Sequence, residues 1–426
     1  MYLEQGYEAA SDKSERGSGG DIRLHAAGRI GHEPEPSIRG HESAADANPF
    51  FEEWALEAAL AHLPSPGAGI DVVGVGRGAA ATAVPLIRRW RLAPGMGSVW
   101  AVWDHIHCFD TTPPVQGDPD AALDAVFAFL VRNGAGMLRW TGLPTDTEFY
   151  QALIRYLERN GLQYRRTGIR QRPVLSGAAA GMDALNGKRM SEFRRRRRRL
   201  EELGRLEVRF HQGTHDADAW MRDFLALEAS GWKGAHGTAI ACNPDECRFF
   251  ESLMRAASAQ GKALVCGLLL DGRPIAMTVN LRTGSGIWGF KTAYDPEYAR
   301  FSPGALCVIE TTAHVLRDPS ITWLDSCMDH DDGPAGVLWP ERRQVVDLLI
   351  SAKRSSNWLP PTAGLALSAW RFVRNRLPPV WKPLGKRPQP VFARAGESRI
   401  RRIITGITSI VVLPEMPTVV LFTASM

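Results

Sequence analysis

The stretch from Ile287 to Leu316, IWGFKTAYDPEYARFSPGALCVIETTAHVL, predicts one strand, one loop and one helix in succession. Its first part, through Tyr294, is rich in aromatic and β-branched residues, which is typical of a strand. Asp295-Pro296 ends the strand, because proline cannot continue the ladder of hydrogen bonds. Ser302-Pro303-Gly304 then predicts a helix start, with Ser at the N-cap and Pro at the first helical position. Apolar residues recur beyond it at helical spacing.

The start of this predicted helix has the chemistry of an anion site. The first backbone N–H groups of a helix have no partner within it, and the helix dipole is positive at that end. Gly304 lets an anionic group approach the backbone closely, because it has no side chain. We therefore expect the N–H groups of Gly304, Ala305 and Leu306 to face an anionic ligand. The alternative is a well-capped helix without a ligand, and the local residues leave both open.

Composition bounds the class of protein. The chain has 426 residues, enough for two ordinary domains with tails, and 44% of them are hydrophobic, which supports sizeable cores. The net charge of +5 is mild and favours acidic ligands without indicating nucleic acid. The six cysteines are scattered and complete no zinc site, which predicts reduced thiols. No export signal or membrane-spanning run is visible, so we expect a cytoplasmic protein.

The pattern along the chain divides it into four segments. Residues 1–47 are rich in Gly, Ser, Glu and His, so we expect them to be disordered. Residues 48–178 and 179–350, the first and second halves, each follow the order helix, antiparallel strands, helix, strand. Residues 351–426 form a C-terminal extension that could contact a membrane surface as a peripheral partner or pack on the second half, which we favour. The repeated order favours an architecture in which one unit is built twice.

Six consecutive arginines, Arg194 to Arg199, lie between the two halves. One interpretation is a patch that binds nucleic acid or phospholipid. The other, which we favour, is a helix with arginines on most faces and one apolar stripe. The stripe predicts that Phe193, Leu200 and Leu203 are buried while most of the arginines are solvated.

Several of these segments resemble a known family. Residues 185–350 resemble the acetyltransferase domain of the CelD/BcsL-type family, within the GNAT superfamily. The most specific element is KTAYDPEYARFSPG, Lys291 to Gly304; weaker ones are FRRRRRRLEELG, LEASGWKG and LLLDGRPIA. Residues 48–178 resemble the degenerate GNAT-like half that often precedes this domain. Fem-type transferases also use paired GNAT units.

The resemblance implies tandem GNAT-like acyltransferase domains in an α/β fold, with a mixed, twisted sheet that has helices on both faces and is built twice. It implies acetyl-CoA or another acyl-CoA as co-substrate, with its pantetheine where the third and fourth main strands splay apart. It implies N- or O-acyl transfer to a small-molecule or glycan acceptor, with a loose link to exopolysaccharide or cell-envelope metabolism. The GNAT phosphate loop, Q/R-x-x-G-x-G/A, would fall on Arg300 to Ala305, where Pro303 replaces the first glycine. The cofactor-binding residues would be Arg300, Ser302, Gly304, Ala305 and Leu306, with no metal.

Acyl transfer from a thioester needs a base for the attacking group and an acid for the departing thiolate. Tyr294, at the strand end, could protonate the thiolate. Asp295 could take the proton, although an aspartate before proline more often forms a turn. His330, in an acidic cluster after the strand at Ile321–Asp325, is a second candidate base, and the alternative there is a solvated loop. The residues expected to bind the acceptor are Trp232, Lys291 and Arg342.

Two other classes of function stay open. One is aminoacyl-tRNA-dependent transfer, as in Fem-type transferases, with tRNA on the arginine run; nucleic acid is otherwise not expected as a partner. The other is a non-catalytic binding protein that keeps the fold, which the proline in the phosphate loop favours. Stabilisation by CoA separates the classes, because a ligand that binds only the folded state raises the melting temperature.

If His330 is the base, replacing it with alanine removes the group that takes the proton of the acceptor. We expect turnover to fall by roughly 10² to 10⁴-fold. CoA affinity should stay the same, because the predicted role does not involve the cofactor. Steady-state kinetics and CoA titration of His330→Ala measure the two effects, and unchanged turnover would move the role to Asp295 or to water.

Overall fold

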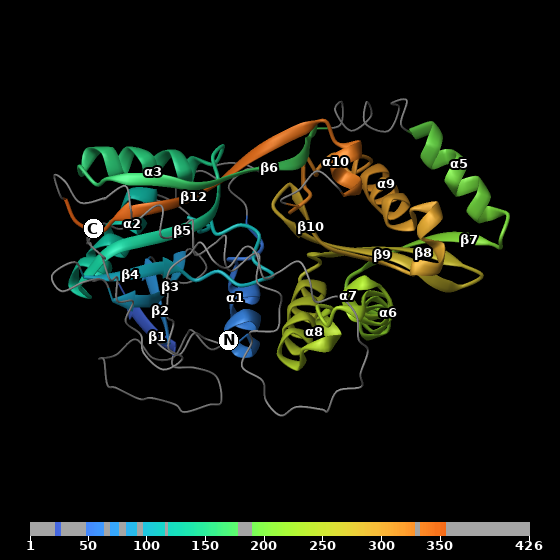
Figure 1. The fold of residues 1–426 in the computed structure, drawn as a ribbon, viewed down its shortest axis with the longest axis horizontal. Helices are drawn as coiled ribbons and strands as arrows, with labels where there is room; N and C mark the ends of the chain where they lie inside the picture. Colours follow the sequence, from blue (N-terminus) through green and yellow to red (C-terminus); the bar gives the residue numbers. More distant parts are fainter. Residues whose placement is uncertain are drawn as a thin grey trace, which may run out of the picture. The chain divides into compact units, whose positions relative to one another are not determined.

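One mixed sheet runs through both halves of the chain (Figure 1). The computed structural model describes residues 22–26, 48–63, 69–75, 82–91, 97–115, 118–177, 190–328 and 333–354. All of them fall in one compact unit, residues 1–356. Within them the sheet has twelve strands in the order β1-β2-β3-β4-β5-β12-β6-β11-β10-β9-β8-β7. The predicted α/β class with a mixed sheet is confirmed.

The first half forms an antiparallel meander followed by a parallel strand. β2, β3 and β4 are antiparallel neighbours, and β4 is parallel to β5. Parallel neighbours need a crossover connection, which α2 supplies. The strands are β2 (Ile70–Val75), β3 (Thr82–Arg91), β4 (Ser98–Val102), β5 (Ala135–Pro144) and β6 (Tyr164–Ser176), and the helices are α1 (Glu53–His62), α2 (Pro119–Arg132) and α3 (Glu148–Arg159).

One strand precedes this half. β1 (Ile22–Ala26) pairs in parallel with β2. Disorder was expected for all of residues 1–47, and this expectation is wrong for these five residues. The exposed edge of β2 provides backbone partners for them, which composition alone does not reveal.

The second half repeats the same order. β7 to β10 are antiparallel in succession, and β10 is parallel to β11 after a crossover through α9. The predicted strand, loop and helix are therefore confirmed as β10, η3 and α9. The strands are β7 (Leu206–Gln212), β8 (Ala263–Leu270), β9 (Arg273–Thr283), β10 (Gly286–Tyr294), β11 (Trp323–Asp325) and β12 (Glu341–Ser351). The helical elements are α5 (Met190–Glu201), α6 (Ala217–Ser230), α7 (Trp232–Ala235), η2 (Ile240–Cys242), α8 (Pro244–Ala259), η3 (Pro296–Phe301), α9 (Pro303–Val315) and α10 (Pro334–Leu338).

Helices cover both faces of the second half's sheet (Figure 1). α9 packs on one face of β8 and β9, and α6 packs on the opposite face of β9 and β10. α5 lies along α9, where Arg197 forms an ion pair with Glu310. None of the helices in the described ranges has the length and apolar character that a membrane span requires. The C-terminal extension lies outside the described residues beyond Arg354.

The arginine run forms α5, as the favoured interpretation predicted. Leu200 is fully buried and Phe193 is partly buried, while four of the six arginines are exposed. The prediction is wrong for Leu203, which is 48% exposed. α5 ends at Glu201, so the helical period that would have buried Leu203 does not extend to it.

The two halves exchange their last strands. β6, from the first half, pairs with β11 of the second, and β12, from the second half, pairs with β5 of the first. β6 and β12 also pair with each other, antiparallel, from Glu341↔Val174 to Ile350↔Tyr164. Each half's sheet is thus completed by a strand of the other half. A boundary near residue 178 divides the chain, but it does not divide the sheet.

A buried carboxylate binds both exchanged strands. Asp325, at the end of β11, is fully buried, and its Oδ2 accepts from Arg343 of β12 at 3.3 Å and from Arg172 of β6 at 3.5 Å. Its Oδ1 accepts from the N–H of Cys327 at 2.7 Å. Both arginines are at most 2% exposed. Buried charges are costly unless they are paired, so this group is stable only when the exchanged strands lie side by side.

Asp325→Asn keeps the shape of the side chain and removes its charge. Two buried guanidinium groups then lose an anionic partner, and removing one member of a buried pair costs about 3–5 kcal/mol. Urea unfolding followed by circular dichroism should show a lower midpoint. Asp318→Asn is the control, because Asp318 pairs with Arg282 at the surface and is 41% exposed. Equal midpoints for the two variants would contradict a stabilising role for Asp325.

Candidate functional site

β10 and β11 pair over a short distance and then separate. Their parallel ladder runs from Gly286↔Trp323 to Trp288↔Asp325 and ends there. Gly289, the next residue, still lies close to the backbone that follows β11, since a Cβ added to it would lie 3.0 Å from the Ser326 carbonyl oxygen. Beyond it β10 continues to Tyr294 and pairs with no described residue on this side. The resemblance expects the pantetheine at this separation of the third and fourth main strands.

A bulge in β10 directs side chains at the point of separation. The register against β9 shifts between Gly289 and Lys291, so β10 carries an extra residue, Phe290. The Phe290 ring stacks on Phe250 of α8, at 6.3 Å between ring centres. The Lys291 Nζ lies 5.4 Å from the centre of the Phe109 ring and 5.5 Å from that of Phe290. The predicted acceptor residue Lys291 is thus placed beside the separating strands.

Lys291 is desolvated. Burial, and secondarily the charge of Lys233, lowers the pKa of its ammonium to about 8. Glu228 and Glu246 raise that pKa, but each already has other partners. Glu228 accepts from the Nζ of Lys233 and from the N–H of Ile240, both at 2.8 Å. Within the described residues Lys291 makes no ion pair of its own.

The loop after β4 brings two histidines of the first half to the same place. The His107 Nε2 lies 3.1 Å from Glu246 Oε2 of α8, and the ring stacks on Phe249 at 5.4 Å. The His105 Nδ1 accepts from the N–H of His107 at 3.3 Å. Burial lowers the pKa of both rings, that of His105 to about 3, so both are neutral at neutral pH. Sequence reasoning missed them, because Glu246 is 139 residues away from His107.

The N-terminus of α9 has fewer free N–H groups than predicted. The N–H groups of Ala305 and Leu306 donate to the carbonyl of Ser302 at 3.0 and 3.1 Å. Pro303 has none, which leaves the N–H of Gly304 without a backbone partner in the described residues. The expectation that three N–H groups face an anion is therefore wrong for Ala305 and Leu306. The physical reason is that the N-cap carbonyl accepts the first bonds of the helix.

Two arginines flank this helix end. Ser302 is the N-cap, as predicted, but its φ is +52° and its side chain caps no N–H. Its hydroxyl instead accepts a hydrogen bond from Arg196 of α5. Arg300 is exposed, and its guanidinium lies 4.7 Å from the centre of the Phe301 ring. Attraction for an anion at this place therefore comes mainly from side-chain charge. Arg196 belongs to the predicted arginine run but was not singled out from the sequence.

Tyr294 and Asp295, the two candidate catalytic residues at the end of β10, differ in their environment. Tyr294 is 37% exposed, and a Cβ added to Gly304 would lie 3.4 Å from its ring, so it borders the start of α9 as predicted. Asp295 is buried and caps η3: its Oδ1 accepts from the N–H of Glu297 at 3.0 Å. Its Oδ2 accepts from Arg273 at 2.8 Å. With both oxygens engaged, the geometry favours the turn-forming interpretation over a base.

The remaining predicted residues are dispersed. Trp232 is 61% exposed at the start of α7. Gly231, just before it, lies close to the end of β10, because a Cβ there would be 3.8 Å from the Tyr294 carbonyl oxygen. Arg342 donates to the carbonyls of Trp339 and Gly336, so it braces α10 and β12. His330 lies outside the described residues, and its role stays a prediction.

The equivalent separation in the first half is filled by the chain itself. The β4–β5 ladder ends at Ala101↔Arg139. Past that point the N–H of Thr111 donates to the Gly142 carbonyl at 3.3 Å. The Thr111 hydroxyl donates to the Thr141 carbonyl. The Trp140 indole N–H donates to the Thr111 carbonyl at 3.3 Å. The chain thus occupies the edge of β5 that a ligand between the strands would need.

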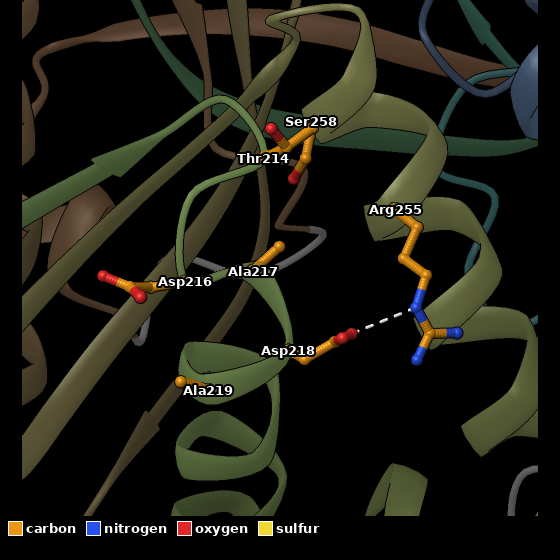
Figure 2. Close-up of a pocket in the computed structure, with 7 residues that line it drawn as sticks. All are labelled: Thr214, Asp216, Ala217, Asp218, Ala219, Arg255 and Ser258. Atoms are coloured by element: carbon orange, nitrogen blue, oxygen red, sulfur yellow. Dashed lines mark hydrogen bonds and ion pairs between the residues drawn. The ribbon is translucent and has the colours of Figure 1, made fainter.

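A cavity of about 490 Å³ opens elsewhere, at the N-terminus of α6 (Figure 2). Asp218 and Arg255 face each other in it and form an ion pair at 3.1 Å. Trp232 follows the opposite end of this 14-residue helix, about 20 Å away. No predicted site residue lines this cavity, so we do not assign the transfer site to it. Its lining residues are Thr214, Asp216, Ala217, Asp218, Ala219, Arg255 and Ser258.

A family model described as "Acetyltransferase (GNAT) domain" matches residues 187–332. The match spans α5 to β11, and the separation of β10 and β11 lies within it. These residues therefore have the character of a GNAT-type domain, while the finer resemblance to the CelD/BcsL type stays a prediction. The chain matches no curated protein. No cluster of three or more metal-ligating side chains occurs among the described residues.

Solved structures similar to this chain have low identity to it. FemX has 10% identity and a TM-score of 0.47, and the match covers 72% of this chain and 94% of that one. The C-terminal domain (DUF2156) of a putative lysylphosphatidylglycerol synthetase from Agrobacterium fabrum has 14% identity, a TM-score of 0.46, and coverage of 71% and 88%. A tandem GNAT protein from the clavulanic acid biosynthesis pathway has 15% identity, a TM-score of 0.37, and coverage of 71% and 89%. No function follows from likenesses at these scores.

His105→Gln should make the stability of the protein less sensitive to acid. The pKa of His105 is about 3 in the folded protein against an ordinary 6.5, so the unfolded chain binds the proton first as the pH falls. The stability due to the neutral ring is complete above pH 6.5 and is lost progressively between 6.5 and 3. Urea unfolding at about pH 7.5 and about pH 5 measures the loss. His215→Gln, at a side chain 90% exposed, should behave as wild type. Equal acid sensitivity of His105→Gln and wild type would contradict the assignment.

Proposed function

We propose that the chain is an acyl-CoA-dependent acyltransferase that transfers an acyl group, acetyl in the simplest case, to an amine or hydroxyl of a small-molecule or glycan acceptor. The main support is the separation of β10 and β11 inside the segment that the GNAT model matches. Among the described residues the edge of β10 beyond this point has no backbone partner, unlike the corresponding edge in the first half. The link to exopolysaccharide or cell-envelope metabolism stays a prediction from the resemblance.

The donor side of the proposed site consists of β10 and the start of α9. Two glycines allow close approach here: a Cβ at Gly289 would lie 3.0 Å from the Ser326 carbonyl oxygen, and one at Gly304 would lie 3.3 Å from Thr292, so the start of α9 packs closely on β10. Arg300 and Arg196 would hold the pyrophosphate by charge, together with the N–H of Gly304. The bound CoA would supply the activated acyl group as a thioester. Tyr294, beside the helix start, is placed to donate a proton to the departing thiolate.

The acceptor side consists of α6, α7, α8 and the loop after β4. Lys291 and Trp232 face the acceptor in this proposal, and Lys233 is anchored on Glu228 behind them. His107, fixed by Glu246 and stacked on Phe249, is a neutral base candidate in addition to the predicted His330. Its Nδ1 is buried and has no hydrogen-bond partner in the described residues. A neutral ring nitrogen in that state can accept a proton when a polar group reaches it.

A second candidate function is a non-catalytic binding protein with the GNAT fold. The observation that favours it is the start of α9, where two of the three expected N–H groups already donate within the helix. A protein without a usable phosphate site would have no affinity for CoA. Binding of CoA therefore separates the two candidates.

Arg300→Ala should weaken CoA binding at least tenfold. A charge-assisted hydrogen bond contributes about 1.5–3 kcal/mol, and a tenfold change in affinity needs about 1.4 kcal/mol. Calorimetric titration of CoA into wild type and variant measures the difference. Arg317→Ala is the control, because Arg317 is an exposed arginine just after the opposite end of α9. If wild type shows no heat of CoA binding, the proposed function is wrong. Equal affinities for the two variants would remove Arg300 from the site.

A further inference from the structure

Lys291 differs from the other lysines among the described residues 190–328. The described residues 190–328 contain Lys233, Lys262 and Lys291. Lys233 pairs with Glu228 at 2.8 Å, and Lys262 pairs with Glu52. Lys291 forms no ion pair within the described residues, and its Nζ lies 5.4 and 5.5 Å from the centres of the Phe109 and Phe290 rings instead. A carboxylate in direct contact would hold its nitrogen in the charged form, and here Glu228 and Glu246 raise its pKa without forming an ion pair with it.

The surroundings of Lys291 increase the neutral fraction of its amine. Its pKa is lowered to about 8, chiefly by burial and then by the charge of Lys233. At pH 7 such an amine is neutral in about one molecule in ten, against fewer than about one in a thousand for an unperturbed lysine. A neutral, desolvated amine is a nucleophile. The charged and titratable groups around it are Glu228 and Lys233 near α6 and α7, Glu246 on α8, His105 and His107 of the first half, and Cys327 after β11.

Lys291 also lies where an acyl donor would present its carbonyl. The β10–β11 ladder ends at Trp288↔Asp325, and the bulge that includes Lys291 follows directly. The Cys327 side chain, on the other side of the separation, is close enough to affect the Lys291 ammonium. A thioester held between the separating strands would therefore meet this side chain.

We propose that Lys291 is itself an acyl acceptor, so that the chain transfers an acyl group from bound acyl-CoA to its own Lys291. The proposal rests on the proposed function. The lone pair of the neutral Nζ attacks the thioester carbonyl carbon, a C–N bond forms and the C–S bond breaks. The CoA sulfur leaves as thiolate and takes up, through solvent, the proton that the nitrogen loses. The product is an amide without charge.

This modification would act on the proposed acceptor site. The amide removes the cation that a carboxylate or phosphate of the acceptor would meet, and the acyl group occupies space beside Phe109 and Phe290. Self-acylation would thus close the acceptor side when donor is present without acceptor. Self-acylation can also be measured before the natural acceptor is identified.

The test is incubation of the full-length chain with acetyl-CoA, followed by peptide mass spectrometry. We expect Lys291 to gain one acetyl group at least tenfold faster than Lys262. Lys262 is a matched control in the same molecule, since it is also partly buried and lies 5.7 Å from the Trp54 ring, but it has an acidic partner. The rate at Lys291 should rise with pH, reach half of its maximum near pH 8, the pKa of its ammonium, and level off above that pH. CoA titration by calorimetry on the same preparation reports donor binding separately.

Two variants and one reagent complete the test. Lys291→Arg keeps the charge and should abolish the labelling, while Lys262→Arg should leave labelling of Lys291 unchanged. Acetic anhydride acetylates amines without binding at the CoA site, so it reports the intrinsic reactivity of each lysine. It should also react faster with Lys291 than with Lys262. CoA binding with equally slow acetylation of Lys291 and Lys262 would overturn the proposal and leave the proposed function standing. If Lys291 reacts fast with anhydride but is not labelled by acetyl-CoA, although CoA binds, the proposal is overturned too. Absence of CoA binding would remove both.

Discussion

The antiparallel pairing of β6 with β12 is the interaction on which the rest of the structure depends. Each of these strands also completes the sheet of the opposite half, so the two halves share one continuous ladder. The buried group of Asp325, Arg172 and Arg343 lies at this exchange and favours the arrangement in which both strands are in place. Separation of the halves would break hydrogen bonds on three strand edges and expose paired charges at once.

This shared sheet explains why the candidate site is made from both halves. The loop after β4 belongs to the first half, yet its His107 is hydrogen-bonded to Glu246 and its Phe109 ring lies near the Lys291 Nζ. Contacts of this kind need the halves to be held in a constant relation, which the exchanged strands provide. The first half therefore contributes side chains to the acceptor side of the proposed site, although its own strand separation is filled by Thr111 and its neighbours.

The two strand separations show how the same order of elements can have different outcomes. Between β4 and β5 the chain returns to the strand edge and satisfies its hydrogen-bonding groups. Between β10 and β11 the ladder ends at Trp288↔Asp325 and the bulge after Gly289 follows, and the edge of β10 beyond it is open within the described residues. The difference comes from the segments that follow the two strands. After β4 a long loop precedes α2, whereas after β10 the short η3 leads directly into α9.

The sequence by itself determined the local elements and the fold class. Proline, glycine and the apolar period predicted β10, η3, α9 and the arginine helix, because these signals act between residues a few positions apart. Placement of Tyr294 beside the start of α9 followed from the same stretch. Only the tertiary structure decided the strand exchange, the contact of His107 with Glu246, and the environment of Lys291. Those features join residues far apart in the chain, and their energy comes from burial and pairing that no local pattern records.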